Sequence, residues 1–106
     1  MTQKQIRTDL RNIRYYYARK TNLDKVFILV ENEVKQKAES YNRLMQSAPP
    51  RLFELYFELY VHCHTQVEIA KMWGFCVGYI RNLHQKLCVF LQNAFAEKMK
   101  GGEKHV

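Results

Sequence analysis

The chain has 106 residues, of which 47% are hydrophobic and 25% are charged, a composition that excludes an intrinsically disordered segment and allows one folded domain. Its net charge of +7 favours nucleic acid as a partner, although many basic domains bind no nucleic acid. With 4 Gly and 2 Pro, few positions suit tight turns, so we expect an all-α protein.

Residues 2–20 are predicted to form the first helix. Its apolar positions recur every three or four residues and therefore share one face; they are Ile6, Leu10, Ile13 and Tyr17. A second stripe of basic side chains runs beside this face; it consists of Lys4, Arg7, Arg11 and Arg14. The basic stripe fits an ordinary solvated helix face and also an edge that faces nucleic acid, and both interpretations stay open.

A second, longer helix is predicted from about residue 22 to residue 46, after a break at Thr21-Asn22, whose side chains can cap a helix. Its apolar positions follow a heptad-like spacing; they are Leu23, Phe27, Val30, Val34, Ala38, Tyr41 and Met45. Such a helix must be covered, either by the first helix in a hairpin or by a second copy of the chain in a dimer. An uninterrupted helix over residues 2–46 is an alternative.

Ser47-Ala48-Pro49-Pro50 is the clearest interruption in the chain, because two prolines end one helix and can begin the next. We therefore expect residues 1–48 to form an N-terminal helical region for dimerisation or partner binding. Residues 49–96 would form a tri-helical module. Residues 97–106, with two glycines and no apolar period, would be a flexible basic tail.

The helix predicted over residues 51–62 is apolar almost all round, with Glu54 and Glu58 marking its wet face. A helix of this kind is buried on two sides. We expect it to lie between the N-terminal helices and the segment that follows.

The segment Thr65–Leu91 has the features of a helix-turn-helix. Thr65 and Glu68 have the spacing of a capping box, and Gly74 suits the left-handed conformation that ends a helix. Phe75 is expected to fill the turn. A second apolar period follows, made of Ile80, Leu83, Leu87, Phe90, Leu91 and Ala94.

The outward face of this second helix carries the candidate DNA-reading residues: Val77, Gly78, Arg81, Asn82, Gln85 and Lys86. Arg can bind guanine, and Asn or Gln can bind adenine, through paired hydrogen bonds in the major groove. The candidates for flanking contacts lie at the first helix and at the turn: Thr65, Gln66, Lys71 and Cys76. An ordinary solvated helix face would have similar residues.

The cysteines and histidines are not expected to form a metal site or a catalytic site. Cys63, Cys76 and Cys88 contain no CxxC pair, and structural zinc sites need paired ligands. An odd count of cysteines without a signal peptide predicts reduced thiols in the cytoplasm. The longest apolar run, Val26–Val30, is too short to span a bilayer. We expect no enzyme, no cofactor and no membrane contact.

From Pro50 to Leu91 the chain resembles the fourth conserved region of bacterial sigma factors, which reads a promoter element. The residues that carry the resemblance are Leu59-Tyr60, His62-Cys63-His64-Thr65, Glu68-Ile69-Ala70, Gly74, Ile80, Leu83, Lys86 and Leu91. The family's base-reading positions fall on Val77, Gly78, Arg81 and Asn82. Val77 and Gly78 depart from the family because neither side chain donates a hydrogen bond, and Cys76 replaces the usual Ser or Thr.

The overall order of a basic helix, a long helix and a sigma-like module is similar to small phage regulators of the ArpU and RinA type. The resemblance implies a transcriptional regulator that binds double-stranded DNA, with RNA polymerase and a second copy as possible partners. One alternative is a helical protein-interaction module that does not read DNA. Another is a phage DNA-packaging small subunit, in which the motif would be expected near the N-terminus.

Overall fold

The computed structural model describes the backbone of residues 1–20 and 28–104 and the side chains of residues 1–19 and 33–98. The described residues are helical or irregular, with no β-strand among them, and this confirms the predicted all-α class. The helices are α1 (Gln3–Lys20), α2 (Ile28–Met45), α3 (Pro50–Tyr56), the π-helical segment η2 (Phe57–Val61), α4 (Gln66–Trp73) and α5 (Val77–Lys104).

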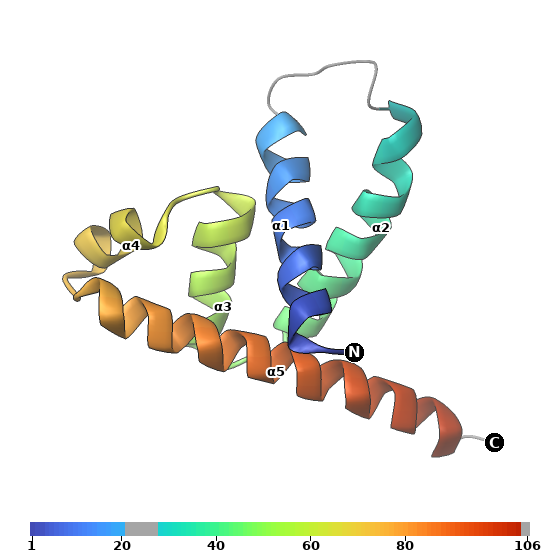
Figure 1. Ribbon diagram of the computed structural model, residues 1–106. Helices are drawn as coiled ribbons and strands as arrows, with labels where there is room; N and C mark the ends of the chain where they lie inside the picture. Colours follow the sequence, from blue (N-terminus) through green and yellow to red (C-terminus); the bar gives the residue numbers. More distant parts are fainter. Residues whose placement is uncertain (21–27, 105–106) are drawn as a thin grey trace.

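Helices α1 and α2 form an antiparallel hairpin (Figure 1). The predicted apolar face of α1 is confirmed, because Ile6, Leu10 and Ile13 are buried and Tyr17 is half-buried. On α2 the buried positions are Ala38 and Tyr41 together with Met45; they lie three and four residues apart, as the helical period requires.

The hairpin corrects the alternative of one uninterrupted helix over residues 2–46, because α1 ends at Lys20 and α2 packs back along it. The predicted break at Thr21-Asn22 lies outside the described residues. The side chains of Leu23, Phe27 and Val30 also lie outside them.

The third helix begins at Pro50, where proline leaves no backbone donor unpaired, and it does not continue regularly to residue 62 as expected. It widens at η2, where the His62 N–H donates to the Phe57 carbonyl oxygen at 2.8 Å. Cys63 then takes a left-handed conformation (φ 62°), and the His64 N–H donates to the Glu58 carbonyl oxygen at 2.8 Å. These bonds end the helix without a glycine and turn the chain toward α4.

Helix α4 has the predicted terminal signals. The Thr65 hydroxyl accepts from the Glu68 N–H at 3.1 Å, and the Glu68 carboxylate accepts from the Thr65 N–H at 2.8 Å, which confirms the capping box. Gly74 is left-handed (φ 75°), and the Phe75 N–H donates to the Ala70 carbonyl oxygen at 2.9 Å. Phe75 does not fill the turn, however, because its side chain is 41% exposed.

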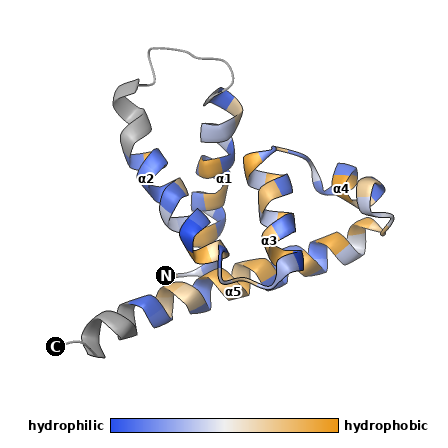
Figure 2. Cartoon of the chain, turned by 180° about the vertical axis from the view of Figure 1, so that it is seen from behind, coloured by the Kyte–Doolittle hydropathy of each residue, from blue (hydrophilic) through white to orange (hydrophobic). Residues whose placement is uncertain are grey.

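Helix α5 passes beneath α3, α1 and α2, and each of these helices has hydrophobic stretches (Figure 2). Their buried apolar side chains form one core. The buried residues of α5 are Ile80, Leu83, Leu87, Cys88 and Leu91. The helix continues to Lys104, through most of the segment 97–106 that was expected to be flexible. The prolines at 49 and 50 therefore separate elements along the chain but not two cores.

Candidate nucleic-acid interface

The exposed face of α5 contains most of the predicted base-reading residues. Gly78, Arg81, Asn82, Gln85 and Lys86 are all exposed, and their spacing of three and four residues places them along one side of the helix. Val77 does not belong to this face, because its side chain is half-buried and packs against the core. The interpretation of Val77 as an outward residue was therefore wrong.

The predicted flanking residues differ in how free they are to bind. Lys71 and Cys76 are exposed, and Gln66 is half-buried in the first turn of α4. The hydroxyl oxygen of Thr65 already accepts the Glu68 N–H. Thr65 therefore acts first as a helix cap, and its hydroxyl proton is what remains for an acceptor such as phosphate.

The basic stripe of α1 lies directly beside the exposed face of α5. Arg7 Nη2 donates to Gln85 Oε1 at 2.8 Å, and Gln3 Nε2 donates to Gln92 Oε1 at 2.6 Å. Sequence reasoning identified the stripe but not its position. Two residues 78 positions apart in the chain meet here, and local spacing contains no signal for such a contact.

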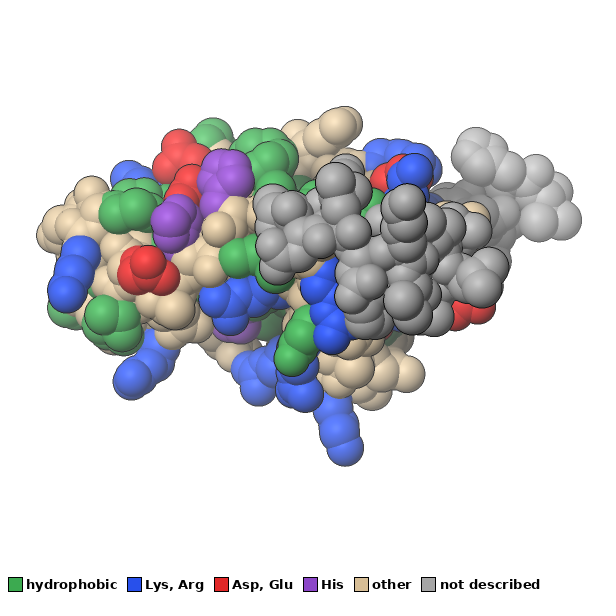
Figure 3. All heavy atoms as spheres, turned by 90° about the horizontal axis from the view of Figure 1, so that it is seen from above, with side chains coloured by type: hydrophobic (Ala, Val, Ile, Leu, Met, Phe, Trp, Pro, Cys, Tyr) green, Lys and Arg blue, Asp and Glu red, His purple; other side chains and the backbone are tan. Residues whose placement is uncertain are grey.

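Figure 3 shows several Lys and Arg side chains that project at the lower edge of the molecule in that view. The ion pairs of the described residues join Lys37 to Asp9, Arg51 to Glu54, and two histidines to Glu58 and Glu68. None of them involves Arg7, Arg81 or Lys86, so these cations are not neutralised by a carboxylate of the described residues.

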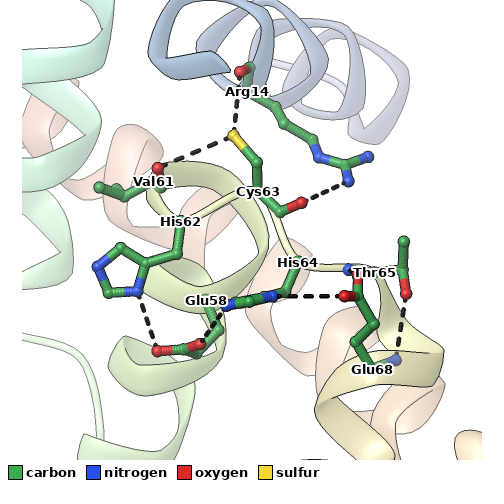
Figure 4. Close-up of polar contacts among 8 residues, drawn as sticks. All are labelled: Arg14, Glu58, Val61, His62, Cys63, His64, Thr65 and Glu68. Carbon is green, nitrogen blue, oxygen red and sulfur yellow. Dashed lines mark hydrogen bonds and ion pairs between the residues drawn. The ribbon is translucent and has the colours of Figure 1, made fainter. Parts of the chain in front are cut away.

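A pair of reciprocal bonds joins α1 to the loop before α4 (Figure 4). Arg14 Nη2 donates to the Cys63 carbonyl oxygen at 2.9 Å, and Cys63 Sγ donates to the Arg14 carbonyl oxygen at 3.5 Å. The same loop holds His62 and His64 against Glu58, with nitrogen–oxygen distances of 3.1 and 3.5 Å. The loop that leads into α4 is therefore fixed from both sides.

Behind the exposed face, His84 of α5 contacts Tyr60 of η2 through Nε2 and the phenol oxygen. Burial lowers the pKa of His84, and the nearby Arg7 guanidinium lowers it further. Cys88 Sγ lies 4.0 Å from His84 Nδ1, and burial raises the pKa of this thiol. A protonated buried thiol is a poor nucleophile, so this Cys–His pair fits packing better than catalysis.

An aromatic pair sits where the turn enters α5. The Phe75 and Tyr79 rings are 4.5 Å apart, and their side chains are 41% and 39% exposed. Arg51 of α3 covers Trp73 and Phe75, with its guanidinium carbon 4.9 and 5.7 Å from the two ring centres. Sequence reasoning placed Phe75 in the turn and so missed this exposed surface.

Within residues 1–19 and 33–98, no group of three or more His, Cys, Asp or Glu side chains is arranged to hold a metal ion. Across the helices that the structure describes, none is long and apolar enough to cross a membrane. Comparisons of the chain with protein-family models, with curated proteins and with solved structures find no match.

Proposed function

We propose that the protein binds double-stranded DNA and reads it with the exposed face of α5. The observation that carries this proposal is the contact between Arg7 and Gln85, which sets the basic stripe of α1 against the polar face of a helix that follows a tight turn. A helix about 10–12 Å in diameter fits a major groove about 12 Å wide. Arg81 and Asn82 lie in the first two turns of α5, the part that reaches base edges in helix-turn-helix proteins.

The proposed division of work follows from side-chain chemistry. Arg81 and Asn82 present donors suited to guanine and adenine edges, so they would supply base selection. Lys86 and Lys71 are exposed cations that would meet phosphate oxygens and supply affinity without selection. By its resemblance to sigma region 4 and to small phage regulators of the ArpU and RinA type, such a protein would act as a phage-type transcriptional regulator, with RNA polymerase or a second copy bound through the hairpin.

The test is selection of binding sites from a random duplex pool by the natural protein and by the double variant Arg81→Ala/Asn82→Ala. We expect the natural protein to enrich a sequence and the double variant to lose that preference, at about 1–3 kcal/mol for each lost base contact. Because both residues are exposed, thermal unfolding should change little. A variant that selects the same sequence as the natural protein would refute the proposal.

The exposed Phe75–Tyr79 pair favours a second candidate, a protein-interaction module that uses the turn instead of the groove face. Aromatic residues are enriched in the centres of protein interfaces. This candidate predicts that wild-type protein gives no salt-sensitive shift with random duplex. It also predicts that Phe75→Ala, and not Arg81→Ala, removes binding of the protein partner.

A further inference from the structure

Three exposed cations of α1 adjoin the candidate DNA-reading face. Lys4 precedes Arg7 by three residues and Arg11 follows it by four, so all three side chains lie along one side of α1. The hydrogen bond from Arg7 to Gln85 fixes which side that is, because it points toward the exposed face of α5. Lys4, Arg7 and Arg11 are exposed.

The one acidic residue of α1 is turned to the other neighbour. Asp9 pairs with Lys37 at 2.9 Å and accepts the Tyr41 hydroxyl at 2.8 Å, and both partners belong to α2. No ion pair among the described residues occupies Lys4, Arg7 or Arg11. The helix therefore presents its negative charge to α2 and its positive charge beside α5.

We propose that α1 is a second DNA-binding element, whose Lys4, Arg7 and Arg11 contact the phosphate backbone along one wall of the groove that α5 enters. This proposal rests on the proposed function and adds to it a second DNA-contacting surface, on α1. The basis is spatial. A helix about 10–12 Å across nearly fills a groove about 12 Å wide, so an element that touches its flank must lie over the groove wall. Arg7 touches that flank at 2.8 Å, and Gln3 does so at 2.6 Å.

The proposed contacts would add affinity and no sequence selection, because phosphates are the same at every base pair. Each phosphate neutralised by a cation contributes about 0.9 to the slope of log affinity against log salt concentration. Arg7 also holds Gln85, so its replacement would disturb two functions at once. Among the residues that the structure describes, no hydrogen bond or ion pair occupies the side chains of Lys4 and Arg11, so their replacement isolates the phosphate contribution.

The experiment measures binding of a fluorescent duplex by anisotropy over a series of salt concentrations. We expect Lys4→Ala/Arg11→Ala to lower the slope by about 2, on both a selected site and a random duplex. The matched control is Lys35→Ala/Arg43→Ala, which removes the same charge from exposed positions of α2 and should leave the slope unchanged. Lys4→Arg/Arg11→Lys retains both charges and should also bind as the natural protein does.

Two results would overturn the inference. The first is an unchanged slope in Lys4→Ala/Arg11→Ala while Arg81→Ala/Asn82→Ala still loses selection, which would leave the proposed function standing without α1. The second is an equal loss of slope in the α2 control, which would show that total charge and not position matters. Absence of duplex binding by the natural protein would instead refute the proposed function itself. Circular dichroism of each variant checks that the fold is retained.

Discussion

At the scale of single residues, the buried contact between His84 and Tyr60 fixes a protonation state. Burial is the main cause that raises the pKa of Tyr60, so its phenol stays protonated where it contacts His84 Nε2. The other ring nitrogen, Nδ1, faces Cys88 Sγ at 4.0 Å, and burial of the ring lowers the pKa of His84. The imidazole is therefore held neutral between α5 and η2.

This neutral imidazole makes stability depend on pH. The folded pKa of His84 is lowered below its unfolded value of about 6.5, so below that pH the unfolded chain binds more protons than the folded chain. The contribution of His84 is fully present above about pH 6.5 and is lost as pH falls toward the folded pKa. We expect a lower free energy of unfolding in urea at pH 5.5 than at pH 7.5, with a smaller decrease in His84→Gln.

Comparing the two proteins cancels the contributions of the titrating groups that both proteins share. The same pH dependence in both proteins would contradict a buried neutral His84.

At the scale of elements, the sequence was informative where a structure depends on neighbours in the chain. The capping box at Thr65 and Glu68 and the left-handed Gly74 form as predicted because each needs only three or four consecutive residues. The widened end at η2 was missed because its left-handed residue is Cys63, not the glycine or asparagine that usually marks such a position. The turn is held in part by α1, because Arg14 donates to the Cys63 carbonyl oxygen.

In the candidate site, too, the sequence predicted the local features and missed those that depend on tertiary contacts. The helical period was enough to place Arg81, Asn82 and Lys86 on the exposed face of α5. It was not enough to show that Val77 packs inward or that Arg7 holds Gln85, since both depend on where another helix lies. Tertiary contacts between distant segments leave no local period in the sequence.

The two glycines of the helix-turn-helix give a test at this scale. A Cβ added at Gly78 would lie 4.0 Å from Cys76 Sγ, an ordinary contact, so the fold does not require glycine there. We expect Gly78→Ala to raise the free energy of unfolding by about 0.5–1 kcal/mol, because alanine favours a helix. If α5 lies in the groove, the added methyl should weaken DNA binding about tenfold, or 1.4 kcal/mol.

Gly74→Ala is the matched control, because the φ of 75° at Gly74 strains any residue with a Cβ. The free energy of unfolding of this variant should fall by about 1–2 kcal/mol. Unchanged DNA binding by the stabilised Gly78→Ala protein would count against a close approach of α5 to the bases.

At the scale of the whole molecule, the hairpin and the helix-turn-helix share one core. Ile6 and Leu10 of α1 belong to the same buried cluster as Leu55 of α3 and Leu87 of α5. The chain therefore has two regions in sequence but is expected to unfold as one cooperative unit. Its single tryptophan, Trp73 in α4, lies under Arg51 of α3 and so reports on the C-terminal half of the fold and not on the hairpin directly.

Leu10→Ala tests this unity. Leu10 is 1% exposed, and its truncation should cost about 2–5 kcal/mol. We expect the urea midpoint seen by Trp73 fluorescence to fall by the same amount as the midpoint seen by far-ultraviolet circular dichroism. A Trp73 midpoint that stays in place while part of the helical signal melts earlier would show that the hairpin unfolds on its own.

The two reciprocal hydrogen bonds between Arg14 and Cys63 would affect how the hairpin is oriented in the proposed complex with DNA. Two bonds in opposite directions resist both sliding and pivoting of α1 against the loop before α4. If the protein binds DNA as proposed, the α1–α2 hairpin would then keep a fixed orientation relative to the duplex. A partner bound to α2 would therefore be positioned on one side of the double helix, in an orientation set by the packing of the hairpin.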